Sequence, residues 1–342
     1  MRKITVASRF RRILGIGGIG VGWVYSLEGD RTLGREESRP ARLLNIVDRC
    51  KLQIILHYVA VAVRDLNLPM KVSPIGMVGK DAEGRLLLGE MQAAGMRTDQ
   101  VRSVAGHRTQ TSICLQYPDG SGGNITESAS AAAQLTVRSI SGIAKRLSAK
   151  DIVLVAPEVP MAVRLALIAS AHRRMAFVAA SFTAQELTAK GIDQSLKRVD
   201  LLALNMHEAR IWIAATSRTA PDQVVAMARA RFIALNPRGK LSVTDGGRGS
   251  YYVTAQQSHY QPGLRVAVAN TAGAGDAYFA GLLLAEALAG SDGADPARAC
   301  ALARAIAALS VTSRDTIHQG FSLAALRDFS RKNKLQISLG AG

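Results

Sequence analysis

The feature that most constrains the fold of this chain is a regular alternation of short apolar runs with longer segments rich in Ala, Leu and Arg. The short runs are typical of buried strands, and the longer segments carry apolar residues at helical spacing. Strands are predicted at residues 12–16, 71–76, 151–156, 176–180, 201–205 and 240–244. Helices are predicted at residues 56–66, 84–94, 163–174, 221–234, 276–289 and 295–310. The alternation predicts an α/β fold with a central, mostly parallel sheet and helices on both faces.

Two stretches interrupt this rhythm. Residues 26–48 are polar and charged, and residues 109–127 have the pattern of a hairpin around the turn P-D-G-S-G-G. Glycine adopts positive φ freely, which such turns require. We expect both stretches to project from the main body as a small β lid. Because the sequence has neither an internal repeat nor a clear linker, residues 1–342 are interpreted as a single domain.

Composition excludes several classes of protein. Hydrophobic residues make up 48% and charged residues 20% of the chain, which is globular composition. Cys50, Cys114 and Cys300 are too few and too scattered for a disulfide framework or a zinc site, so a reducing, cytoplasmic compartment is expected. Apolar stretches fall short of the roughly 20 residues of a membrane span, and the N-terminal residues lack a signal-peptide cleavage pattern. We therefore expect no membrane association.

The charge balance is strongly basic. The chain has 43 Lys and Arg against 26 Asp and Glu, a formal net charge of +17. This balance suits an anionic ligand such as a nucleotide. The basic residues are spread along the whole chain without a run of five or an interleaving of aromatic residues. We therefore expect no specific nucleic-acid partner.

The strongest local signal is N-T-A-G-A-G-D at residues 270–276, directly before an apolar helix. Such a loop leaves main-chain amides unpaired at a helix N-terminus, where the helix dipole favours negative charge. Gly273, Ala274 and Gly275 would form this anion hole, with the Asp276 carboxylate beside it. Phosphoryl transfer to a hydroxyl needs both, since the amides stabilise charge and the carboxylate takes the proton. The alternative is a plain glycine-rich loop with Asp276 as an N-cap.

A second glycine pattern suggests a different class. Residues 15–20 satisfy G-x-G-x-x-G after a strand, and Glu36 and Glu37 follow at about the spacing of a dinucleotide-binding dehydrogenase. That fingerprint requires a helix next. Residues 19–27 instead alternate like a strand, which disfavours the dehydrogenase.

Four segments, in order, resemble the motifs of the ribokinase-like (PfkB) carbohydrate kinases. They are G-M-V-G-K-D-A-E-G at 76–84 with Gly95 and Asp99 following, N-M-H-E at 205–208, T-D-G-G-R-G at 244–249, and N-T-A-G-A-G-D at 270–276. The resemblance covers about residues 13–320. It implies a ribokinase-like fold and phosphorylation, dependent on ATP and Mg²⁺, of a hydroxyl on a sugar or sugar-like small molecule. It also implies that Asp276 is the catalytic base. Lid strands of this family often pair between subunits, so the resemblance allows a homodimer.

The resemblance also implies roles on the nucleotide side. Asn205 and Glu208 would position phosphates and Mg²⁺, with Glu208 reaching the ion through water. Thr244, Gly246 and Gly249 would line the nucleotide. From the residues alone, the first pair could equally be a strand-end Asn and a first-turn Glu, and the second set a plain β-turn.

The acceptor side departs from the family pattern. Asn270 replaces the usual Asp, which argues against activation by a monovalent cation. The family's N-terminal G-G-x-x-x-N is missing in both registers considered, residues 40–45 and 53–58. The remaining candidates for acceptor contacts are Asp30, Arg42, His57, Tyr58 and Glu158. His57 and Tyr58 could instead be packing residues, and Glu158 a solvated strand-end charge. A nucleoside kinase, or a non-catalytic sensor of sugars or nucleotides, remains an alternative.

Overall fold

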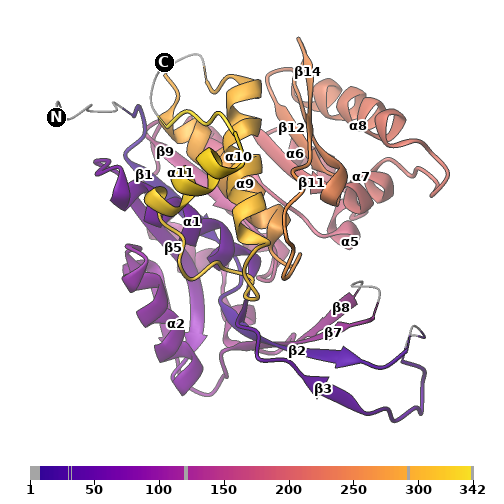
Figure 1. The fold of residues 1–342 in the computed structure, drawn as a ribbon. Coiled ribbons are helices and arrows are strands. Elements are labelled where there is room, and N and C mark those ends of the chain that lie inside the picture. The colour runs from indigo at the N-terminus through magenta and orange to yellow at the C-terminus, as the bar shows by residue number, and fades with distance from the viewer. Residues whose placement is uncertain (1–7, 30, 32, 119–121, 291–292, 340–342) are drawn as a thin grey trace.

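A nine-stranded sheet forms the centre of the structure, a computed structural model that describes residues 8–29, 31, 33–118, 122–290 and 293–339 (Figure 1). Its strands in spatial order are β14 (Ser258–Pro262), β13 (Gly249–Val253), β12 (Lys240–Thr244), β11 (Leu201–Asn205), β10 (Phe177–Ala180), β9 (Asp151–Val155), β1 (Arg12–Ile16), β5 (Lys71–Gly79) and β6 (Val101–Val104). The strands from β12 to β6 run parallel, and β13 and β14 add an antiparallel edge. The prediction of a mostly parallel sheet is confirmed.

Alternate residues of the buried strands face two separate cores. On β9, Ile152 and Leu154 belong to one core and Val153 and Val155 to the other. This two-sided burial explains why these strands are continuous apolar runs. The first core is covered by α1 (Lys51–Asp65), α2 (Ala82–Ala93), α9 (Ala274–Leu288), α10 (Pro296–Ser310) and α11 (Leu323–Lys332). The second is covered by α3 (Val137–Lys145), α4 (Met161–Arg173), α5 (Ala184–Leu187), α6 (Ile192–Leu196), α7 (Met206–Trp212) and α8 (Pro221–Leu235).

The predicted elements match the observed ones best where the strands are buried. β1, β11 and β12 have the predicted bounds. The helix predicted at 56–66 begins five residues earlier, at Lys51, so its first turn reaches the end of the sheet. The prediction missed α3, α5, α6, α7, α11 and the edge strands β6, β13 and β14, most of which are short.

A second, smaller sheet projects from the body (Figure 1). It contains β3 (Ala41–Leu43), β2 (Gly20–Leu27), β7 (Gln110–Gln116) and β8 (Gly122–Thr126), and β4 (Asp48–Arg49) also pairs with β2. β7 and β8 form the expected antiparallel hairpin. β2 begins at Gly20, ahead of the stretch assigned to the lid, because it pairs in parallel with β7 over seven residues. Whether this sheet closes as a lid stays a prediction.

The glycines at 15–20 lie where the chain leaves β1 of the central sheet and enters β2 of the smaller sheet. Gly20 opens β2 and not a helix, so the dinucleotide fingerprint fails. A Cβ at Gly17 would lie 2.9 Å from the Cβ of Ala156, and one at Gly20 would lie 2.5 Å from the carbonyl oxygen of Gln110. Side chains at these positions would separate the strands. Among the described residues, no helix has the length and apolarity to cross a membrane.

Close packing of α9 on α10 depends on Gly281. A Cβ there would lie 2.4 Å from the Cα of Ala303. We expect Gly281→Ala to lower the free energy of unfolding by about 1–3 kcal/mol through overpacking. The matched control is Gly89→Ala on α2, where a Cβ would meet nothing within 4 Å. It should raise the free energy of unfolding by about 0.5–1 kcal/mol, because alanine loses less backbone entropy. Urea unfolding measures both, and equal effects at the two sites would contradict this account.

Candidate active site

The N-terminus of α9 presents free main-chain amides beside a carboxylate. Gly273 precedes the helix with φ of +79°, and a Cβ there would lie 2.7 Å from the carbonyl oxygen of Thr316. Among the described residues, the amides of Gly273, Gly275 and Asp276 have no hydrogen-bond acceptor. Ala274 differs from the prediction, because its amide donates to the Thr271 carbonyl at 3.2 Å. The amides available to an anion are therefore those of residues 273, 275 and 276, without that of Ala274.

Asp276 lies within reach of a single ammonium group. The Nζ of Lys51 is 3.7 Å from the Oδ1 of Asp276 and 4.0 Å from the Oε1 of Glu208. Burial raises the pKa of Asp276 to about 6, and the charges of Glu158 and Glu208 act in the same direction, while Lys51 opposes the rise. Burial lowers the pKa of Lys51, but these carboxylates together hold it above its ordinary value. The site thus pairs a basic carboxylate with a firmly protonated lysine.

Two cavities meet at this pair. One has a volume of about 450 Å³ and the other about 390 Å³, and Lys51, Thr271 and Asp276 line both. The larger cavity has an apolar end formed by Val266, Val268, Ala307, Ala308 and Val311. Ala274 and Gly275 face the larger cavity, and Gly273 the smaller one. Because the two cavities share one carboxylate, two ligands could bind on either side of Asp276, each within reach of it.

The larger cavity brings together the residues predicted for the nucleotide. Asn205, Glu208, Thr244, Gly246 and Gly249 all line it. They reach it from the carboxyl ends of β11 and β12 and from the start of β13, neighbouring strands of the central sheet.

Asn205 and Glu208 form a capping box at the start of α7. The Oδ1 of Asn205 accepts from the amide of Glu208 at 2.8 Å, and the Oε2 of Glu208 accepts from the amide of Asn205 at 2.8 Å. Glu208 is only 8% exposed, so it is not the solvated first-turn residue of the alternative interpretation. Its Oε1 faces Lys51 and the cavity. Among the described residues no group of three or more His, Cys, Asp or Glu could hold a metal ion. One carboxylate oxygen beside an amide is compatible with Mg²⁺ that keeps most of its water.

The smaller cavity contains Glu158 at its base. Glu158 follows β9 with φ of +75°, and its Oε2 is buried without a hydrogen-bond partner among the described residues. Burial raises the pKa of this carboxyl group. A buried acceptor without a partner is costly in a folded protein, and a bound ligand could satisfy it. Glu158 is therefore a cavity residue and not a solvated charge, and its contact with an acceptor stays a prediction.

Three other predicted acceptor contacts are wrong. Tyr58 is fully buried, its hydroxyl accepts from the amide of His318 at 2.9 Å, and its ring packs on Phe321. His57 is partly buried nearby, and burial lowers its pKa to about 4. Both lie about one turn along α1 beyond Ile54, which lines the smaller cavity, and neither lines a cavity itself. Arg42 is exposed on β3 and lines neither cavity. Asp30 lies outside the described residues.

Sequence reasoning missed Lys51 and Asp48. Both line the smaller cavity, and they flank the junction between β4 and α1. The signal was the charged stretch D-R-C-K at 48–51, directly before the apolar helix. It was overlooked because the predicted helix began at residue 56, which placed these residues in a loop.

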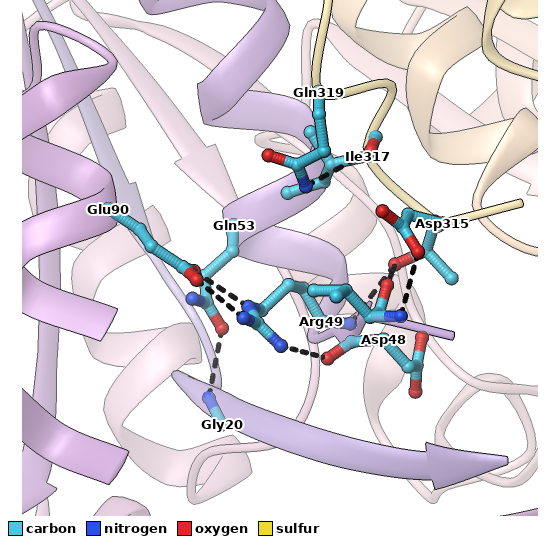
Figure 2. A network of polar contacts seen from close by, with 10 residues as sticks. Gly20, Asp48, Arg49, Gln53, Glu90, Asp315, Ile317 and Gln319 are labelled. Atoms are coloured by element: carbon cyan, nitrogen blue, oxygen red, sulfur yellow. Dashed lines mark hydrogen bonds and ion pairs between the residues drawn. The ribbon is translucent and has the colours of Figure 1, made fainter. Parts of the chain in front are cut away.

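A polar network holds this junction in place (Figure 2). The guanidinium of Arg49 donates to both carboxylate oxygens of Glu90 on α2, at 2.6 and 2.8 Å. Its Nη1 also donates to the main-chain oxygen of Asp48 at 2.8 Å. The Oε1 of Gln53 accepts from the amide of Gly20 at 2.9 Å, which ties the first turn of α1 to β2. The position of Lys51 is thus fixed from both sides.

Known proteins share this architecture. A ribokinase of Schizosaccharomyces pombe is 26% identical over 226 residues, which are 64% of this chain and 69% of that protein. The solved ribokinase of Giardia lamblia superposes with a TM-score of 0.81 at 19% identity, over 94% of this chain and 99% of that one. The ribokinase of Cryptococcus neoformans, solved with ADP, has a TM-score of 0.73 at 19% identity, over 93% and 99% of the two chains. The model of the pfkB family of carbohydrate kinases matches residues 59–321, so this chain belongs to that family.

Proposed function

We propose that this protein transfers the γ-phosphoryl group of ATP to a hydroxyl group of a sugar or sugar-like small molecule. The observation that carries the proposal is the position of Asp276, between two cavities and beside unpaired helix amides. Membership of the pfkB family supports the reaction class, and the Cryptococcus relative, solved with ADP, supports nucleotide binding.

The chemistry follows from the charges around Asp276. Its carboxylate accepts the proton of the acceptor hydroxyl, whose oxygen then forms a bond to the γ-phosphorus. The bond from that phosphorus to the bridging oxygen breaks, and ADP leaves with the electron pair. The amides of Gly273, Gly275 and Asp276 and the ammonium of Lys51 stabilise the negative charge on the transferred group. We propose that the smaller sheet closes over the acceptor and excludes water.

Magnesium belongs to the same proposal. Asn205 and Glu208 would hold the water shell of the ion, because the cap hydrogen bonds leave mainly the Oε1 of Glu208 facing the cavity. The ion supplies neutralisation of phosphate charge when it is bound. A homodimer and a cytoplasmic location stay predictions.

The first test is Asp276→Asn, which keeps the shape of the side chain and removes its basicity. Turnover should fall about 10²–10⁴-fold, while the Kd for ATP should change little. The control is Asp295→Asn, at the N-cap of α10 and outside both cavities, which should leave turnover unchanged. Steady-state kinetics over a panel of sugars and nucleosides, with calorimetry for ATP, measure both. Unchanged turnover in Asp276→Asn would overturn the proposal, and ATP binding without product over the panel would favour a sensor.

The second test is the pH dependence of kcat/KM. Because the pKa of Asp276 is raised to about 6, the base is protonated below that pH and the rate should fall as pH drops through it. Lys51→Met removes the charge that opposes this rise. The acid limb should therefore move to higher pH in the variant, in addition to any loss of rate. A limb at the same pH in both proteins would show that another group controls it.

A further inference from the structure

In the described part of the chain, the smaller cavity is lined by three carboxylates and two basic side chains. We infer that it binds a polyol without phosphate or carboxylate groups, either uncharged or carrying an amino group, and that Asp48 is a residue that selects it. This inference rests on the proposed function, and it concerns the acceptor only. It depends on where the carboxylate of Asp48 lies and on which other charges line the cavity.

Asp48 presents its carboxylate to the cavity across β2. Residues 48 and 22 are paired in the smaller sheet, and a Cβ at Gly22 would lie 2.0 Å from the Oδ2 of Asp48. Glycine at this position is what gives the carboxylate its space. The thiol of Cys114, on β7, donates to the same oxygen at 3.2 Å. Among the described residues this thiol is its only hydrogen-bond partner, so acceptor capacity remains for ligand hydroxyls.

The position of Asp48 is fixed before any acceptor binds (Figure 2). Its main-chain oxygen accepts from Arg49, which Glu90 holds in turn. The neighbouring amide of Val47 donates to the carboxylate of Asp315 at 2.9 Å. A preorganised carboxylate does not lose conformational freedom when a ligand binds, so its hydrogen bonds contribute more to affinity.

The charges of the cavity wall are mostly negative. Asp48, Glu158 and Asp276 contribute carboxylates, against Arg49 and Lys51. The side chain of Arg49 is only 7% exposed and is bound to Glu90, on the far side from the Asp48 carboxylate. Lys51 already lies near two carboxylates. Within the described part of the wall, both cations are therefore already engaged: Arg49 with Glu90, and Lys51 with two carboxylates and, in the proposed reaction, with the transferred phosphoryl group.

Repulsion adds to this engagement of the cations. Glu158 and Asp48 line the same cavity, and burial together with the charge of Asp48 raises the pKa of Glu158. A phosphate or carboxylate placed between them would be repelled in a partly desolvated space. Hydroxyl groups can donate to both, and an ammonium group would be attracted. Ser112, Gln116 and Asn124, also on the wall, supply neutral polar partners.

The binding experiment compares matched pairs of compounds by calorimetry with a non-hydrolysable ATP analogue present. The pairs are D-ribose and its 5-phosphate, D-fructose and its 6-phosphate, D-glucosamine and its 6-phosphate, and D-glucose and D-gluconate. At least one uncharged or amino member should bind at least about tenfold more tightly than its anionic counterpart. Tighter binding of the anionic members, or no binding of any uncharged or amino member at about 10 mM, would overturn the inference.

The outcome separates this inference from the proposed function. Phosphorylation of an anionic member in preference to its counterpart would refute the inference and leave the kinase in place. Binding of an uncharged member that never yields a phosphorylated product would support the inference and count against the kinase.

The residue experiment uses Asp48→Asn with the compound that binds. The KM for that acceptor should rise about tenfold or more, because a charged hydrogen-bond acceptor is lost, while the KM for ATP should stay within about twofold. The control is Asp295→Asn, which alters a carboxylate at the N-cap of α10, outside both cavities, and should leave both values unchanged. An unchanged acceptor KM in Asp48→Asn, or an equal rise for ATP, would refute the role of Asp48.

Discussion

The ammonium of Lys51 holds together charges that could not be buried without it. Asp276, Glu208 and Glu158 all act on it, and each is removed from solvent to a large extent. An isolated carboxylate in such a place would become neutral, and a lysine at the start of α1 is unfavourable with respect to the helix dipole. Lys51 offsets part of this cost, because its charge opposes the rise in the pKa of Asp276 and of Glu158. The basicity of Asp276 is a product of this balance.

The fold places the residues of the candidate site at one edge of the central sheet. Glu158 follows β9, Asn205 ends β11, and Thr244 ends β12, so all three reach the carboxyl edge of parallel strands. β9 and β1 lie side by side where the order of strands reverses direction, which is where open α/β sheets leave a crevice. The smaller cavity lies at this reversal, and the larger cavity lies along β11 and β12. The smaller sheet borders the smaller cavity, because its strands β2, β4 and β7 supply part of the wall of that cavity.

Sequence reasoning was most successful where all the residues of a motif lie close together in the chain. The loop before α9 was recognisable because glycines and a first-turn carboxylate lie within seven residues, and the same holds for Asn205 with Glu208. It was wrong for Tyr58 because an aromatic residue on an apolar helix has the same pattern whether it packs in the core or lines a cavity. It missed Asp48 because the pairing of residue 48 with residue 22 is a contact between distant strands.

The sequence by itself determined the order of strands and helices, the two-sided burial of the sheet, and the glycine-rich start of α9. These depend on periodicity and on backbone freedom, which are local properties of the chain. Only the tertiary structure decided that Ala274 uses its amide internally, that Lys51 lies between two cavities, and that the Arg49 guanidinium binds Glu90. The reason is physical: which hydrogen-bond partners and charges a group meets depends on how distant segments pack, and residue spacing alone does not contain that information.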